Sequence, residues 1–229
     1  MKNLLKRLFW EFFPKPVHKI RLGIGRGLLM YADPYETSQR ILGFYEKEIA
    51  PYFIEFARKC DYFFDIGAAD GYYSLIYRKY NKQGKVFVCE GNPEYSKLQK
   101  VNFALNNIEL DNSLFLTHKF IRDKIGNNNI KIDDLIIGEN KNYFFKIDVD
   151  GEELSVLKSA INQIKNNQCY FIIETHSLTL ERDCINFLKN LHYESKIVKN
   201  AFYRIVLPEL RPTEHNRWFI ARREALHFT

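Results

Sequence analysis

Residues 65–71, with the sequence Asp65-Ile66-Gly67-Ala68-Ala69-Asp70-Gly71, form a glycine-containing turn between two regular elements. The apolar run before the turn, residues 60–65, predicts a strand, and residues 72–80 predict a helix. Glycine has no Cβ, so the backbone of such a turn can bend sharply and approach a ligand closely. The pattern lacks the Gly-x-Gly-x-x-Gly of dinucleotide sites and the Gly-Lys-Ser/Thr of phosphate-binding loops. We therefore expect a ligand-binding turn that does not hold a pyrophosphate.

Apolar runs and helical patterns alternate outward from this turn. We expect further strands at residues 85–90, 114–121, 143–148 and 169–174, and helices at residues 93–105, 151–164 and 178–191. Near-continuous apolar strands separated by helices indicate a mostly parallel sheet that is covered by helices on both faces. Residues 194–198 and 217–221 read as two final strands with no helix between them. The sequence thus predicts an α/β fold that ends in an antiparallel hairpin.

Acidic residues stand at the ends of four expected strands, namely Asp65, Glu90, Asp148 and Glu174. In an open α/β sheet the ligand binds beyond the carboxyl ends of the strands. Four carboxylates there argue against a phosphate and favour a cationic or hydroxyl-bearing ligand. Glu90 follows Asp65 by one strand and is placed to accept hydrogen bonds from both hydroxyls of a ribose. A nucleoside without a pyrophosphate fits these features, and S-adenosylmethionine is such a ligand.

From about Gly43 to Arg222 the sequence resembles the FkbM-type family of S-adenosylmethionine-dependent methyltransferases. The motifs that carry the resemblance are the glycine turn and the segments Gly43-Phe44-Tyr45-Glu46, Glu90-Gly91-Asn92-Pro93-Glu94, Ile132-Asp133-Asp134-Leu135, Lys146-Ile147-Asp148-Val149-Asp150-Gly151-Glu152-Glu153 and Phe171-Ile172-Ile173-Glu174-Thr175-His176. The sequence departs from the family pattern at Ala69, where asparagine is frequent, and at Asp150, where glutamate is usual. The resemblance implies a Rossmann-like class I methyltransferase fold, a seven-stranded sheet with an antiparallel last strand. It also implies methylation of hydroxyls on glycans or secondary metabolites.

The turn and the following acidic strand end supply the expected cofactor site. The residues expected to bind S-adenosylmethionine are Asp65, Gly67, Ala68, Asp70, Gly71, Glu90, Gly91, Asn92 and Asp148. Asp133 and Asp134 either reach the adenine side or only begin the next helix, and the second alternative is the stronger.

The fourth and fifth strands of the expected sheet hold the candidate catalytic residues, which are Lys146, Asp148, Glu174 and His176. Because the fold places these strands side by side, Asp148 and Glu174 should end close together. Two adjacent carboxylates repel each other unless a cation or a shared proton intervenes. Lys146 is one such cation; a divalent ion on Asp148, Asp150 and Glu174 is the alternative. We do not favour the metal, because no ligand spacing is diagnostic.

His176 is the natural general base, because the ordinary pKa of a histidine lies near neutral pH. Glu174 would orient it or act as an alternative base. The competing interpretation, about equally weighted, is that His176 caps the next helix. Lys146 is expected to act electrostatically rather than in the chemistry; alternatively, it is a strand-end lysine with a solvated amine.

Composition and charge limit the function classes. The chain has 229 residues, 46% hydrophobic and 27% charged, which argues against global disorder. Residues 1–30 hold seven Lys or Arg and one Glu, a net charge of +6. This equals the formal net charge of the whole chain, so residues 31–229 are neutral overall. A nucleic-acid methyltransferase is therefore a weaker alternative, for which Arg217, Arg222 and Arg223 with Trp218 form the one cluster worth testing. A non-catalytic adaptor that keeps the fold and the cofactor site is the other alternative.

The N-terminal residues 1–13 have an apolar face and a cationic face at helical spacing. Such a helix most often packs on its own domain, but it also suits an anionic membrane surface or a partner. We expect residues 1–55 to form a basic cap and residues 56–229 the methyltransferase domain. The four cysteines lack ligand spacing and fit a reducing compartment, so we expect a cytoplasmic protein, with peripheral membrane contact as an option. No apolar stretch is long enough to span a bilayer. The oligomeric state is left open.

Overall fold

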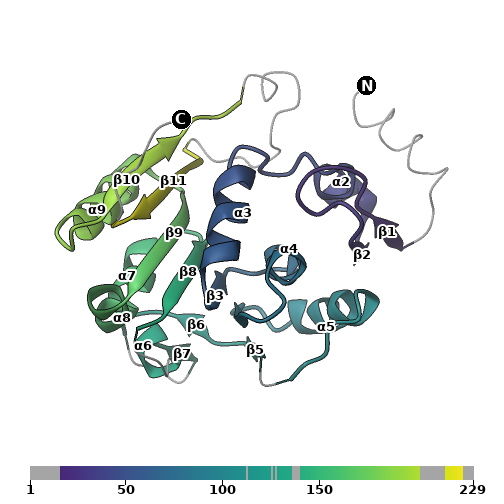
Figure 1. Ribbon diagram of the computed structural model, residues 1–229, viewed down its shortest axis with the longest axis horizontal. Coiled ribbons are helices and arrows are strands. Elements are labelled where there is room, and N and C mark those ends of the chain that lie inside the picture. Colours follow the sequence, from purple (N-terminus) through teal and green to yellow (C-terminus); the bar gives the residue numbers. More distant parts are fainter. Residues whose placement is uncertain are drawn as a thin grey trace.

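A seven-stranded sheet forms the centre of the computed structural model (Figure 1). The structure describes residues 16–111, 113–124, 126, 128–135, 140–201 and 215–223. The order of the strands is β10-β11-β9-β8-β3-β4-β5. Their bounds are β3 Tyr62–Ile66, β4 Lys85–Cys89, β5 Leu114–Thr117, β8 Asn142–Ile147, β9 Gln168–Thr175, β10 Glu194–Val198 and β11 Arg217–Arg222.

The direction of the last strand confirms the expected class I topology. The pairs β3–β4, β3–β8, β4–β5 and β8–β9 are parallel. Strand β11 inserts between β9 and β10 and is antiparallel to both. The predicted late hairpin, made of β10 and β11, is therefore confirmed.

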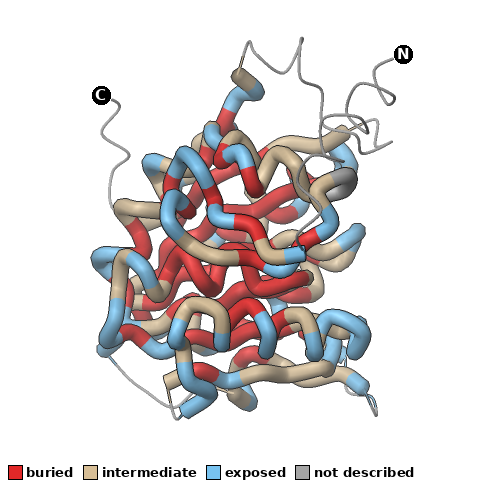
Figure 2. Tube along the Cα trace, turned by 90° about the vertical axis from the view of Figure 1, so that its right-hand side faces the viewer, coloured by how far each residue is buried: buried red, intermediate tan, exposed pale blue. Residues whose placement is uncertain are grey.

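Side chains on the central strands alternate between two cores, one on each face of the sheet. Phe63 and Phe144 point into the core with α3 (Ala50–Lys59), α4 (Tyr72–Tyr80) and α5 (Tyr95–Leu105). Phe64 and Phe145 point into the opposite core, which is completed by α6 (Ile132–Leu135), α7 (Glu153–Ser159), α8 (Ile161–Asn166) and α9 (Leu178–Lys189). Figure 2 shows the buried strands in the middle, with exposed segments outside them. The continuous apolar runs in the sequence result from this two-sided burial.

Two expected elements are divided in the structure. The helix expected over residues 151–164 is two helices, α7 and α8, because Ala160 leaves the helical conformation at φ −110° and ψ 17°. The strand expected over residues 114–121 ends at Thr117, and Phe120–Ile121 forms β6, which pairs with β7 (Asn129–Ile130) in a separate small sheet. This separation brings β6 to the edge of the candidate site described below.

The N-terminal part that the structure describes packs against the sheet domain. A hairpin of β1 (Val17–Lys19) and β2 (Leu29–Tyr31) precedes α2 (Pro34–Leu42). The hairpin lies beside α5, where the side chains of Asn102 and Asn106 accept hydrogen bonds from backbone N–H groups of β2. The amphipathic segment 1–13 lies outside the described residues, and the division at residue 55 remains a prediction. In the described part of the chain, none of the helices is both long and apolar enough to cross a membrane.

Candidate active site

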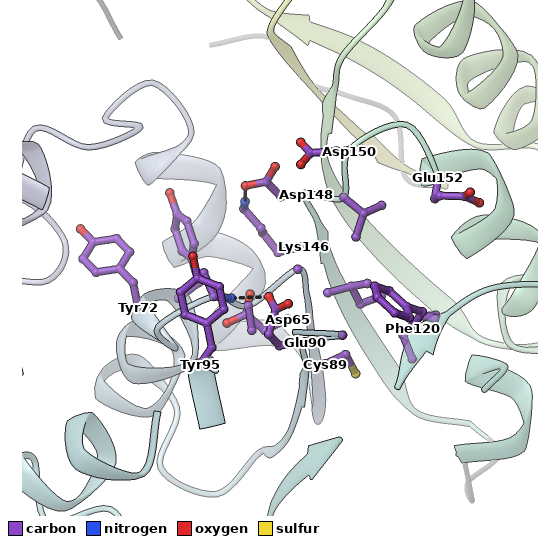
Figure 3. Close-up of a pocket in the computed structure, with 18 of the residues that line it drawn as sticks. Asp65, Tyr72, Cys89, Glu90, Tyr95, Phe120, Lys146, Asp148, Asp150 and Glu152 are labelled. Atoms are coloured by element: carbon purple, nitrogen blue, oxygen red, sulfur yellow. Dashed lines mark hydrogen bonds and ion pairs between the residues drawn. The ribbon is translucent and has the colours of Figure 1, made fainter. Parts of the chain in front are cut away.

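A cavity of about 870 Å³ opens at the carboxyl ends of β3, β4 and β8. Its walls come from the glycine turn, the loop after β4, strand β6 and the loop after β8 (Figure 3). The end of α2 contributes Arg40. The residues expected to bind the cofactor that line it are Asp65, Gly67, Ala68, Glu90, Gly91 and Asp148. Of the expected catalytic residues, Lys146, Asp148 and His176 line it. The sequence therefore predicted the position of the cavity and five of its polar residues, Asp65, Glu90, Lys146, Asp148 and His176.

The turn after β3 is held tightly against the neighbouring strands. Gly67 donates its backbone N–H to the Cys89 carbonyl at 2.9 Å, and Asp148 donates its N–H to the Ile66 carbonyl at 2.9 Å. Gly67 has φ +79°, and a Cβ at this position would lie 1.8 Å from the Asp148 carbonyl oxygen. Only glycine fits there, because both the backbone conformation and the space exclude a side chain. Ala69, at the departure from the family pattern, has φ +45°, a conformation that asparagine adopts more easily than alanine.

Glu90 is fixed by backbone donors on both of its carboxylate oxygens. Ala69 donates its N–H to one oxygen at 2.9 Å, and Asn92 donates its N–H to the other at 2.8 Å. A carboxylate has about four lone-pair sites, so Glu90 keeps acceptor capacity on each oxygen for further donors. The contact with Ala69 ties Glu90 to the turn, which gives a rigid pair of oxygens at the cavity wall.

Asp65 lies at the floor of the cavity and is 1% exposed. Burial raises its pKa to about 6, although the Ser74 hydroxyl, which donates to it at 2.6 Å, and the Lys146 ammonium favour the charged form. A cationic ligand beside this carboxylate would stabilise its charged form and lower its pKa. The floor of the cavity therefore suits a cation.

Lys146 is a buried cation among carboxylates rather than a solvated lysine. It is 2% exposed, and its Nζ lies 3.0 Å from Asp148 Oδ2 and 3.8 Å from Glu46 Oε2 (Figure 3 shows the pair with Asp148). Burial alone would lower the pKa of Lys146, but Asp148, Glu46, Glu174 and Asp65 outweigh it and raise that pKa. The interpretation of Lys146 as a strand-end lysine with a wet amine is wrong, because the ion pairs hold it inside.

A hydrogen bond to Glu153 sets the orientation of His176. The Nδ1 atom lies 2.7 Å from Glu153 Oε1, and Glu153 is fully buried. Nε2 lies 3.8 Å from Asp148 Oδ1 and 3.6 Å from Asp150 Oδ1. The hydrogen bond to Glu153 raises the pKa of His176, partly offset by burial. Glu153 therefore orients His176 through Nδ1, and Glu174, the residue expected in that role, offers an oxygen within 4.8 Å of a His176 ring nitrogen.

Glu174 and the start of α9 have further partners of their own beside His176. Glu174 accepts a hydrogen bond from Trp218 Nε1 at 3.1 Å and is fully buried. The cap of α9 is Ser177, whose hydroxyl accepts from the Leu180 N–H at 3.1 Å. The interpretation of His176 as the helix cap is thus not what the structure shows.

One group of described residues has the composition of a metal site. Asp148, Glu174 and His176 each offer one ligand atom, and these atoms lie within 4.8 Å of one another. Asp150, which was considered as a ligand, is 97% exposed in its side chain. An ion held by Asp148 would share that carboxylate with the Lys146 ammonium, which already supplies a positive charge 3.0 Å away. The donor set is present, but like-charge repulsion from Lys146 opposes a divalent ion there.

Several residues expected at the site support it from outside the cavity lining. Asp70 receives the guanidinium of Arg40 at 2.5 Å and the N–H of Tyr72 at 3.2 Å. Gly71 has φ +83° and begins α4, and Asn92 contributes its N–H to Glu90.

The two acidic residues before α7 lie away from the cavity. The Asp133 carboxylate accepts from the N–H groups of Asn162 and Gln163 at the start of α8. Asp134 lies in a separate groove beside β4 and β5. Neither residue is among those that line the cavity.

The basic cluster considered for nucleic acid is engaged in internal contacts. Trp218 is fully buried, Arg217 pairs with Glu181, and Arg222 pairs with Glu55 at 2.7 Å. Arg223 donates to backbone carbonyls of residues 164, 165 and 167. These side chains brace the last strand and offer no stacking platform.

Among the residues that the sequence did not assign to the site are Arg40, Tyr45, Phe120 and Glu153. Phe120 lies directly over Gly91, since a Cβ on that glycine would lie 2.2 Å from the ring. Arg40 and Tyr45 reach the cavity from α2 and the segment after it. Glu153 ends the Lys146–Glu153 motif, so its presence there was the available signal. For Arg40 and Phe120 no local pattern marked the role.

Known proteins resemble this chain in part of its sequence and in its fold. The family model described as the methyltransferase FkbM domain matches residues 108–205. A crystal structure of a methyltransferase FkbM from Methylobacillus flagellatus KT is 18% identical, with a TM-score of 0.57 over 71% of this chain and 44% of that one. This chain thus spans less than half of that protein. No curated protein matches the sequence.

Two further solved structures share the fold at lower identity. A S-adenosylmethionine-dependent O-methyltransferase from Thermotoga maritima is 14% identical, with a TM-score of 0.55 over 85% of this chain and 72% of that one. An rRNA methylase from Streptococcus thermophilus is 9% identical, with a TM-score of 0.53 over 78% of this chain and 97% of that one. At these identities the likeness concerns the fold, which is the Rossmann-like fold of class I methyltransferases. The resemblance to the FkbM-type methyltransferases is therefore confirmed, by the match of residues 108–205 to the family's domain and by the fold.

Proposed function

We propose that the protein is a S-adenosylmethionine-dependent methyltransferase that methylates a hydroxyl on a glycan or a secondary metabolite. One observation supports the proposed cofactor most strongly. Both oxygens of Glu90, at the wall of the cavity, are held by backbone N–H groups, one of them from the glycine turn. A rigid carboxylate suits the two hydroxyls of a ribose. The fold and the FkbM match supply the class of reaction, and the acidic floor suits a sulfonium better than a phosphate.

The chemistry needs little covalent help from the protein. The acceptor oxygen forms a bond to the methyl carbon while the bond between that carbon and sulfur breaks. The electron pair of the broken bond stays on sulfur. Positioning the oxygen in line with that bond supplies most of the rate. The acceptor hydroxyl also loses a proton, and His176, which lines the cavity and whose buried Nε2 has no hydrogen-bond partner among the described residues, would accept it. Asp148 and Lys146 line the same cavity and set the electrostatics beside the base.

The test of the cofactor site is the substitution Glu90→Ala. We expect it to weaken S-adenosylmethionine binding by roughly 10- to 100-fold, because two hydrogen bonds to a charged group are lost. Calorimetry measures this directly. Glu94→Ala, on the same loop but outside the cavity lining, is the matched control and should bind normally. Unchanged affinity in Glu90→Ala would remove Glu90 from the site.

We also propose that the reaction is independent of a metal, because Lys146 provides the positive charge beside Asp148. Methyl transfer should keep its full rate after dialysis against a chelator. Adding Mg²⁺ or Mn²⁺ to the dialysed protein should change nothing. A rate that falls on chelation and returns with either ion would show that Asp148, Glu174 and His176 hold a metal.

Transfer of a labelled methyl group separates this proposal from a non-catalytic adaptor. The protein is incubated with labelled S-adenosylmethionine and fractions of a cell extract, and the fraction that takes up label is identified. Label in a glycan or small-molecule fraction supports the proposal, and label in RNA or DNA replaces it with nucleic-acid methylation. Cofactor binding with no uptake in any fraction favours the adaptor.

A further inference from the structure

The guanidinium of Arg40 is a largely buried cation in the wall of the cavity. Arg40 lies in the last turn of α2, and its side chain is 18% exposed. It donates to Asp70 Oδ2 at 2.5 Å and to the Tyr45 hydroxyl at 3.4 Å. Its Cζ lies 4.6 Å from the ring centroid of Tyr45 and 5.6 Å from that of Tyr72. The two rings and the carboxylate hold the planar group in one orientation.

Arg40 retains donors for a ligand. A guanidinium has five N–H donors in a rigid fork. Within the described part of the chain, its hydrogen bonds go to Asp70 and Tyr45, one from each terminal nitrogen. Arg40 also lines the cavity and is 18% exposed in its side chain, so its unused donors are within reach of a ligand that fills this space. A fork of this kind matches a carboxylate in geometry as well as in charge.

The other cations of the cavity are less suited to an anionic group. Lys146 is surrounded by carboxylates and is 2% exposed. Lys119 and Arg122 flank Phe120, which covers Gly91 next to Glu90, and the Cζ of Arg122 lies 5.1 Å from the Phe120 ring centroid. Of these cations, Arg40 is the one that contacts the glycine turn, through its hydrogen bond to Asp70.

Arg40 also lies at the opposite end of the cavity from Phe120. Figure 3 places Tyr72, which Arg40 contacts, on one side of Glu90 and Lys146, and Phe120 on the other. A nucleoside whose sugar binds Glu90 extends its substituent along the turn. If the base lies toward Phe120, the amino-acid end reaches the side of Tyr72 and Arg40.

We infer that Arg40 binds the carboxylate at the amino-acid end of the sulfonium nucleoside, an assignment that rests on the function proposed above. Asp70 and the two tyrosines position the guanidinium. The residue lies outside the segment that matches the FkbM domain, so α2 supplies a part of the site that this domain match does not contain.

The test compares two ligands that differ in one group, S-adenosylmethionine and its decarboxylated form. Calorimetry on the wild-type protein should give an affinity roughly 10- to 100-fold higher for the carboxylated ligand, as expected for charge-assisted hydrogen bonds. Arg40→Gln should reduce that ratio to within about 3-fold and leave the affinity for the decarboxylated ligand unchanged. Arg40→Lys, which keeps the charge beside Asp70 but lacks the fork, should give an intermediate ratio. Arg122→Gln, in the same cavity, should keep the wild-type ratio.

Each result has a distinct meaning. If Arg40→Gln weakens both ligands equally, Arg40 only supports the turn, and the inference is overturned. An unchanged ratio in Arg40→Gln, or a ratio lost in Arg122→Gln instead, overturns it as well. If the wild-type protein binds neither ligand, the proposed function fails and the inference with it. Binding of the decarboxylated ligand by Arg40→Gln also reports that the variant is folded.

Discussion

The variant Gly67→Ala should be much less stable than the wild-type protein and should lose cofactor binding. A Cβ at Gly67 would lie 1.8 Å from the carbonyl oxygen of Asp148, which is a backbone atom and cannot rotate away. The backbone at φ +79° adds the usual cost of a left-handed conformation for alanine. Together, strain and overpacking should lower the free energy of unfolding by about 2–5 kcal/mol. For a chain of this size that corresponds to a fall in Tm of roughly 5–20 °C.

Gly27→Ala is the matched control for this experiment. Gly27 also has a positive φ, +96°, but a Cβ there meets no atom within 4 Å. It should cost only the conformational strain, about 1–2 kcal/mol, and leave cofactor affinity unchanged. Thermal denaturation followed by circular dichroism measures both variants. Equal losses of Tm in the two variants would mean that the close approach of the turn to the Asp148 carbonyl adds nothing to the destabilisation caused by Gly67→Ala.

Two features of the sequence made the fold predictable: the apolar strands and the glycines of the turn after the first strand. The parallel sheet follows from apolar runs whose alternate residues, such as Phe63 and Phe64, enter opposite cores. The turn follows from two glycines at defined positions after the first strand. Burial on both faces and close backbone approach leave local marks in the sequence, so the parallel sheet and the position of the cavity could be inferred.

Features that depend on packing left no such marks. The break at Ala160 comes from backbone angles at a residue that favours helices, so the pattern alone predicted one helix. The contact of His176 with Glu153 joins the end of β9 to α7 across 23 residues. Arg40 reaches Asp70 only because α2 packs beside the turn. Partners of this kind are set by the tertiary structure, and the sequence pointed to Glu174, two residues from His176, rather than to Glu153.

His176→Ala should abolish most of the methyl transfer while leaving cofactor binding intact. His176 lines the cavity and presents Nε2 toward the space between Asp148 and Asp150. Loss of a general base typically lowers the rate by about 10²- to 10⁴-fold. Single-turnover transfer of labelled methyl gives the rate, and calorimetry gives the affinity for S-adenosylmethionine. Rates equal to wild type would exclude His176 as the base.

The pH dependence of the rate gives the stricter test, because it reports on the contact with Glu153. A base acts in its neutral form, so the rate should rise with pH through the pKa of His176. The Glu153 carboxylate stabilises the imidazolium and raises that pKa above its ordinary 6.5. Glu153→Gln removes the negative charge but retains a hydrogen-bonding group, so the pKa falls and the acidic limb of the rate profile should move to lower pH. Both proteins bind the same sulfonium, so its own effect on the pKa cancels in the comparison. If Glu153→Gln lowers the rate by the same factor at every pH, Glu153 only supports α7, and the proton of the acceptor leaves by another group.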